Sequence, residues 1–182
     1  HKTMYGPTGI SGFAMKPSCQ LEPILFGGTG FESANQDMPT VLPERFEIGT
    51  MNTQAVAGLY AALKWIEETG VQVLFEREKE NRKRLIDLLN SYVFLKVIGD
   101  SAKVNYVGIV SCVIDGISSD TAGQLFAERK IAVRTGLHCA PLAHKFIGTF
   151  PAGTIRFSTS FFTTDEDFEE LRQVLDDIED NL

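Results

Sequence analysis

The chain has 182 residues, a formal net charge of -7 and 43% apolar residues, a composition typical of a globular protein with a sizeable core. The negative charge disfavours nucleic acid as a partner, and no apolar run is long enough to predict a membrane span. The three cysteines have no zinc-site spacing and favour free thiols in a reducing compartment, so we expect a cytoplasmic protein without a metal site or a membrane partner.

The first 52 residues are rich in Gly, Pro, Ser and Thr, which predicts little regular structure there. The glycine-rich stretch 26–30 could let the backbone approach a phosphate, but it lacks the lysine of a Walker loop, so on its own it indicates a flexible loop. The chain begins at His1 and enters a turn-rich passage at once, as if in the middle of a domain. We therefore expect it to be a fragment of a longer protein.

Two helices should follow. Apolar residues recur at helical spacing after Asn52, with Asn52 or Thr53 as the cap and Gly70 as the end. A second helix is predicted from about Val71 to Asn90, with a charged, solvated face.

The rest of the chain predicts a sheet with helices on one face. Strands are expected at 93–98, 106–114, 131–133 and 154–161, and helices from Ser118 or Ser119 to about Arg129 and after a Thr163 and Glu166 capping box. Cys112 should be a core thiol, and a short helix could follow Pro141. This pattern indicates an open two-layer α+β fold.

The segment 134–140 is the most informative part of this region, because it places Cys139 beyond a glycine turn. Gly136 permits backbone angles that other residues resist, so the thiol could be presented to a substrate. A nearby cation would favour its reactive thiolate form. A small buried hydrophobic residue is the alternative interpretation of this cysteine.

Three reactive residue types stand out together: Lys2, Cys139 and Arg156, the last on the polar face of its strand. A lysine can form a Schiff base, a thiolate can attack sulfur or carbon, and an arginine can hold a carboxylate with two hydrogen bonds. Together they indicate amino-acid chemistry on pyridoxal phosphate. The alternative is that Lys2 and Arg156 are solvated surface charges.

Four segments in order carry a resemblance to a known family: HKTMYGPTG (1–9), RFEIGTMN (45–52), RTGLHCA (134–140) and TIRFS (154–158). They resemble the Schiff-base lysine, phosphate-contacting, nucleophile and substrate-carboxylate segments of cysteine desulfurases of the class V aminotransferase fold, of the type that includes selenocysteine lyases. The sequence departs from the family pattern at Met51, where the family has proline.

The resemblance implies the C-terminal part of a fold-type I transferase: a remnant of the large cofactor-binding domain over 1–52 and the small C-terminal α+β domain over 53–182. Lys2 would bind the cofactor and move protons at the substrate α-carbon. Cys139 would take the sulfur of L-cysteine as a persulfide while alanine leaves, and Arg156 would clamp the substrate carboxylate.

Other site residues follow from the same resemblance. Thr50, with Gly28 and its loop close by, would contact the phosphate of a partner subunit's cofactor, which implies a homodimer. His1 would lie beside the cofactor. From the residues alone, an extended backbone would point His138 away from its neighbour Cys139, so we expect His138 to support the loop. A sulfur-acceptor protein and a role in iron–sulfur cluster assembly are also implied, as is a fragment that is inactive alone, because the residues that precede the lysine in the family are not in this sequence.

Three alternatives remain open: a selenocysteine lyase, a class V aminotransferase, or a non-catalytic dimerisation module.

Overall fold

The computed structural model describes residues 2–99 and 106–181. The chain divides into two compact units, His1–Gly70 and Val71–Leu182. None of the helices in the described ranges is long and apolar enough to cross a membrane.

The first unit is largely irregular before its single long helix, as its composition predicts. It contains a short 3-10 helix, η1 (Glu44–Phe46), and α1 (Thr53–Thr69). The Asn52 side chain accepts a hydrogen bond from the Ala55 N–H and caps α1, and Gly70 ends the helix at a φ of +91°. Both predicted ends of this helix are confirmed.

The boundary between the two compact units lies at Gly70. The reason is that α1 packs on the irregular segment before it. The Tyr5 and Trp65 rings meet edge to face at 5.3 Å. A Cβ on Gly58 would lie only 2.9 Å from Pro7. This close packing ties α1 to the first unit; how the units correspond to the family's two domains stays a prediction.

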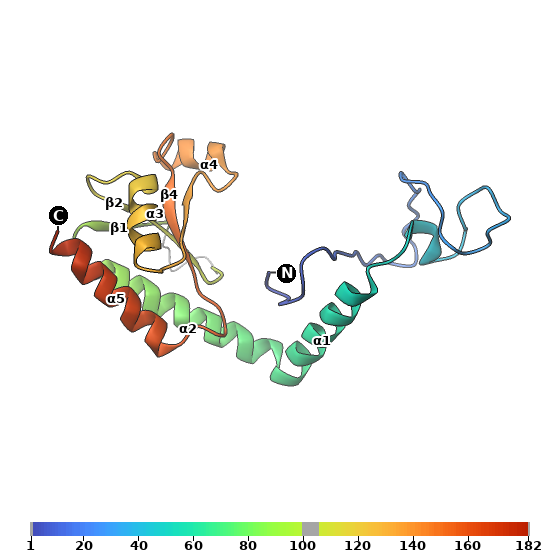
Figure 1. The fold of residues 1–182 in the computed structure, drawn as a ribbon, viewed down its shortest axis with the longest axis horizontal. Helices are drawn as coiled ribbons and strands as arrows, with labels where there is room; N and C mark the ends of the chain where they lie inside the picture. The colour runs from blue at the N-terminus through green and yellow to red at the C-terminus, as the bar shows by residue number, and fades with distance from the viewer. Residues whose placement is uncertain (1, 100–105, 182) are drawn as a thin grey trace. The chain divides into compact units, whose positions relative to one another are not determined.

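The second unit is a four-stranded antiparallel sheet with helices, in the strand order β1-β2-β4-β3 (Figure 1). Its elements in chain order are α2 (Val71–Asn90), β1 (Leu95–Ile98), β2 (Ile109–Ile114), α3 (Ser119–Glu128), β3 (Arg134–Gly136), α4 (Pro141–Phe146), β4 (Thr154–Ser158) and α5 (Asp165–Glu179). The predicted α+β fold with a small open sheet is therefore confirmed in its coarse form.

The core lies on one face of this sheet, under α2, α3 and α5. The inward strand residues Val110, Cys112, Ile155 and Phe157 are at most 5% exposed. Phe126 of α3 is fully buried and its ring meets that of Phe157 edge to face at 5.3 Å. Burying side chains of this size stabilises a fold by about 1.5–3 kcal/mol each.

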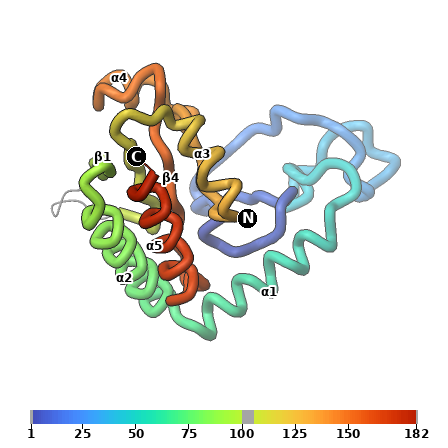
Figure 2. The backbone as a smooth tube through the Cα atoms, turned by 60° about the vertical axis from the view of Figure 1, so that its left-hand side comes forward, coloured from blue at the N-terminus to red at the C-terminus, as the bar shows by residue number. Residues whose placement is uncertain are grey.

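Helices α2 and α5 lie side by side and run in the same direction (Figure 2). At one end Arg84 forms an ion pair with Asp165 at 2.7 Å. At the other end the Tyr92 hydroxyl donates to Asp176. Burial, and then this hydrogen bond, raise the pKa of Tyr92 to about 12.

Three local predictions are corrected. The strand expected at 131–133 is β3 at 134–136, because the Ile131 N–H is used by the Phe126 carbonyl at the end of α3. The strand expected to reach Phe161 ends at Ser158, because the Ser160 N–H bonds to the Thr163 hydroxyl in a turn. The capping box lies one residue later, between Thr164 and Asp167.

Candidate active site

The sheet face opposite the helices carries two arginines on neighbouring strands. Antiparallel pairing places Arg134 of β3 directly opposite Arg156 of β4, so both side chains belong to the same face. None of the ion pairs among the described residues includes Arg134 or Arg156, and the buried Nε atom of Arg156 has no hydrogen-bond partner there. Two neighbouring arginines that pair with no carboxylate of the described residues have the chemistry to bind an anion such as a carboxylate.

Cys139 lies at this cationic site. Arg134 Nη2 donates to the Cys139 Sγ at 3.6 Å, and the cysteine is exposed. The thiol is therefore accessible and has a guanidinium directly beside it.

The backbone around the thiol is a tight turn of residues 137–140, the Cys139 turn, closed by the Ala140 N–H and the Leu137 carbonyl at 2.8 Å. Gly136 before it has a φ of +94°, as its predicted role requires. His138 and Cys139 have φ values of +50° and +61°, a conformation that side chains resist and that costs about 1–3 kcal/mol for each residue. Such a turn persists only if its surroundings hold it.

Two histidines, one in the Cys139 turn and one in the helix that follows it, form hydrogen bonds near the thiol. His138 Nε2 shares a hydrogen bond with the Thr154 hydroxyl in β4 at 3.0 Å. His144 Nδ1 shares one with the Thr149 hydroxyl at 2.7 Å, and the two rings are 5.6 Å apart. We expected His138 to support its loop from an extended backbone; the backbone is left-handed instead, and the support comes from the bond to Thr154.

The charge around His138 disfavours its protonated form. Burial, and then electrostatic interactions with Arg156, His144 and Arg134, lower the pKa of His138 below 6.5. The imidazole is therefore neutral at neutral pH and serves as a hydrogen-bonding group.

This lowered pKa predicts a loss of stability in mild acid. As the pH falls below about 6.5, the unfolded chain takes up a proton at His138 before the folded chain does, so stability present above that pH is lost on acidification. The urea midpoint of unfolding, followed by circular dichroism from neutral to mildly acidic pH, should fall less steeply in His138→Gln. An equal slope in both proteins would contradict the assignment.

The other two cysteines differ sharply from Cys139. Cys112 is fully buried in the core, and burial raises the pKa of its thiol to about 12, so the predicted core thiol is confirmed and is unreactive at neutral pH. Cys19 is exposed in the first unit.

The remaining candidate residues belong to the first unit. Lys2 is exposed, in a turn closed by the Tyr5 N–H and the Lys2 carbonyl. The Gly28 carbonyl accepts a hydrogen bond from the Gly49 N–H at 2.7 Å, so the structure brings the glycine-rich loop next to the segment that holds Thr50. His1 lies outside the described residues.

Sequence reasoning assigned no role to Arg134, Thr154, His144 or Thr149. The strand was placed three residues early, and this hid the pairing of Arg134 with Arg156. Thr154 precedes Arg156 by two residues in the same strand, so the alternation of the strand could have assigned both to the same face. The bond between His144 and Thr149 closes a loop over five residues, and no periodicity predicts it.

Comparisons with known proteins all point in one direction. The model of the class-V aminotransferase family matches residues 1–171. A probable cysteine desulfurase 2 of Mycobacterium leprae is 31% identical over 94% of this chain and 41% of its own length. A probable cysteine desulfurase of Haemophilus influenzae is 32% identical over 97% of this chain and 40% of its own. The chain thus spans less than half the length of these relatives.

Solved structures agree. A cysteine desulfurase from Thermococcus onnurineus is 27% identical with a TM-score of 0.75, over 88% of this chain and 40% of that protein. One from Escherichia coli, in an S-sulfonic acid form, is 25% identical with a TM-score of 0.73, over 88% and 39%. A variant of C-DES with glycine covalently linked to its pyridoxal phosphate cofactor is 25% identical with a TM-score of 0.59, over 74% and 31%.

Proposed function

This chain belongs to the class-V aminotransferase family, and from that premise we propose that it is part of a pyridoxal-phosphate-dependent cysteine desulfurase, supplying the sulfur-accepting thiol and the substrate-carboxylate site. The observation that carries the proposal is the placement of Cys139 beside Arg134, itself opposite Arg156. An aminotransferase needs no thiol at such a position, whereas sulfur transfer does. The order of the sequence motifs supports assignment to the C-terminal part of the family fold.

The first unit fits part of such a cofactor. The Gly28–Gly49 contact brings the glycine-rich loop and the Thr50 segment together, and the loop residues 26–33 and 35–38 line a cavity of about 400 Å³. Added Cβ atoms on Gly28 and Gly30 would meet nothing within 4 Å, which leaves room for phosphate oxygens beside the backbone. Lys2 offers an exposed amine. Thr50 would contact the phosphate of a partner subunit's cofactor, so a homodimer is part of the proposal.

In the proposed reaction, residues of this chain position the substrate and accept its sulfur atom. Arg156 holds the carboxylate of L-cysteine with two parallel hydrogen bonds. Arg134 stabilises negative charge on Cys139 Sγ, which attacks the substrate sulfur. The S–S bond forms, the bond between the substrate β-carbon and its sulfur breaks, and the electron pair stays on the β-carbon, which takes up a proton equivalent to the one that the Cys139 thiol released. Lys2 Nζ moves the proton at the substrate α-carbon. Pyridoxal phosphate, when bound, delocalises the charge on that carbon. L-cysteine and a thiol become alanine and a persulfide.

The test uses the complete protein that carries this chain, with pyridoxal phosphate and L-cysteine. We expect alanine in solution and, in peptide mass spectra, one added sulfur atom on Cys139. Lys2→Ala should abolish both products. A protein that makes neither product contradicts the proposal. Selenocysteine in place of cysteine, and pyridoxamine formation with a keto acid, test the lyase and aminotransferase alternatives. The chain by itself should be inactive, and a dimer without any turnover would favour the dimerisation module.

The two arginines should give different kinetic signatures. Arg156→Ala is expected to lower kcat/KM for L-cysteine by roughly 10²-fold, mainly through KM, because a charge-assisted carboxylate contact contributes about 1.5–3 kcal/mol. Arg134→Ala should act mainly on kcat, because its contact is to the nucleophile. Steady-state alanine formation by both variants and by the Lys96→Ala surface control gives the comparison; equal KM effects would contradict the division of roles.

A further inference from the structure

His144 is a buried group that the proposed chemistry does not use. It is 4% exposed and lies in α4, five residues after Cys139. Its ring bonds to the Thr149 hydroxyl, and its carbonyl accepts hydrogen bonds from the N–H groups of Thr149 and Phe150 at 2.9 and 3.2 Å. Three hydrogen bonds therefore tie residues 147–153, the 147–153 loop, to this one residue.

The hydrogen bonds continue from the 147–153 loop to the Cys139 turn. The Gly153 N–H donates to the Thr149 carbonyl at 2.7 Å. Thr154, the next residue, shares its hydroxyl with His138 at 3.0 Å. His138 is the neighbour of Cys139, and both have the left-handed backbone that has to be held. A continuous path thus runs from His144 to the thiol within the second unit.

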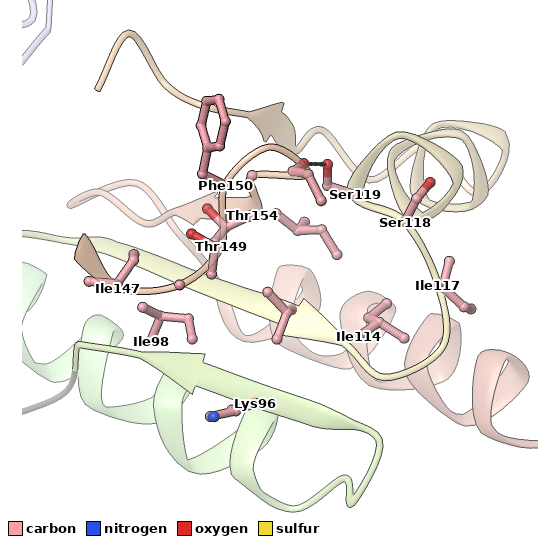
Figure 3. Close-up of a pocket in the computed structure, with 15 residues that line it drawn as sticks. Lys96, Ile98, Ile114, Ile117, Ser118, Ser119, Ile147, Thr149, Phe150 and Thr154 are labelled. Atoms are coloured by element: carbon pink, nitrogen blue, oxygen red, sulfur yellow. Dashed lines mark hydrogen bonds between the residues drawn. The ribbon is translucent and has the colours of Figure 1, made fainter. Parts of the chain in front are cut away.

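One side of the 147–153 loop is not closely packed, although Gly153 at its end packs tightly on Gly136. The loop forms one wall of a cavity of about 350 Å³, and Ile98, Val113 and Ile114 of the sheet are among the residues of the wall across it. Figure 3 shows Thr149 and Thr154 on the loop side of this space, with Ile98 and Ile114 on the sheet side. The loop lacks dispersion contacts on the side that faces this cavity, so its polar contacts contribute more to its position there.

We propose that His144 is a positioning residue that, through Thr149 and Thr154, holds the Cys139 turn in the conformation that keeps the thiol beside Arg134. The inference extends the proposed role of Cys139. Its test needs neither cofactor nor substrate, so a failed desulfurase assay and a failed positioning test are separate results.

The test measures alkylation of the three cysteines by iodoacetamide in the native full chain, with peptide mass spectrometry for each site. In His144→Leu and Thr149→Val, the Cys139 rate should fall by about three- to tenfold, the range for losing one hydrogen bond in a network. The rate falls because the thiol loses its cation. Asparagine offers a polar atom at the position of Nδ1, so His144→Asn should keep the rate of the parent chain, as should Thr149→Ser.

The chain supplies its own controls. Cys112 is fully buried and stays unreacted unless the second unit unfolds, and exposed Cys19 in the first unit reports reagent strength. Leu142→Ala, at an exposed position of the same helix, should change nothing. An unchanged or raised Cys139 rate in Thr149→Val, with Cys112 still protected, overturns the inference. If His144→Leu exposes Cys112, the comparison of Thr149→Val with Thr149→Ser tests the inference by itself.

Discussion

Replacing Cys139 by serine is expected to lower persulfide formation from L-cysteine by roughly 10³-fold or more, because a hydroxyl is a far weaker nucleophile toward sulfur than a thiolate. Serine keeps the size of the side chain, so the turn and the Arg134 contact are changed little. The measurement is the rate of alanine release by the complete protein with L-cysteine, together with the sulfur content of the protein.

Cys19→Ser is the matched control, since Cys19 is exposed but lies in the other unit. It should keep the parent rate. Full alanine release by Cys139→Ser would contradict a sulfur-accepting role and move the assignment toward the aminotransferase or lyase alternatives. Loss of activity in the Cys19→Ser variant instead would place the acceptor thiol elsewhere.

Gly153→Ala is expected to destabilise the second unit by about 2–5 kcal/mol, the sum of left-handed strain and overpacking. Its φ is +76°, and a Cβ there would lie 2.3 Å from the carbonyl carbon and oxygen of Gly136. These are backbone atoms of β3, so the contact can be relieved only by moving the strand that leads to the Cys139 turn.

Gly148 offers a closely matched comparison, because its φ is also +76° but an added Cβ would meet no atom within 4 Å. Gly148→Ala should therefore cost only the strain, about 1–2 kcal/mol. Urea unfolding followed by alkylation of Cys112 measures the second unit, and the fluorescence of Trp65 measures the first, which should be unaffected. Equal losses in the two variants would show that the contact with Gly136 is unimportant.

Much of the fold could be predicted from the sequence where the signal is local. The hydrophobic period and the Asn52 and Gly70 caps predicted α1 and its ends, and the same reasoning predicted α2 from 71 to 90. Alternation predicted the two faces of β4, hence the core position of Phe157 and the open-face position of Arg156. The motif order predicted the family that the comparisons show.

Errors occurred where local signals compete. Ile131 and Val133 have strand-like side chains, yet they pack against the core while the backbone N–H of Ile131 closes the end of α3. Thr163 and Thr164 are adjacent, and either hydroxyl could cap the last helix. The Thr163 hydroxyl accepts the Ser160 N–H in the preceding turn, so Thr164 is the capping residue.

The sequence by itself determined the helices, the core face of the sheet and the candidate thiol with its glycine turn, because these depend on side-chain period and on local backbone freedom. Only the tertiary structure decided that Arg134 faces Arg156, that Arg134 reaches Cys139, and that His144 is tied to the loop behind the thiol. Strand register and loop closure join residues distant in sequence, and their energies come from contacts that no local pattern records.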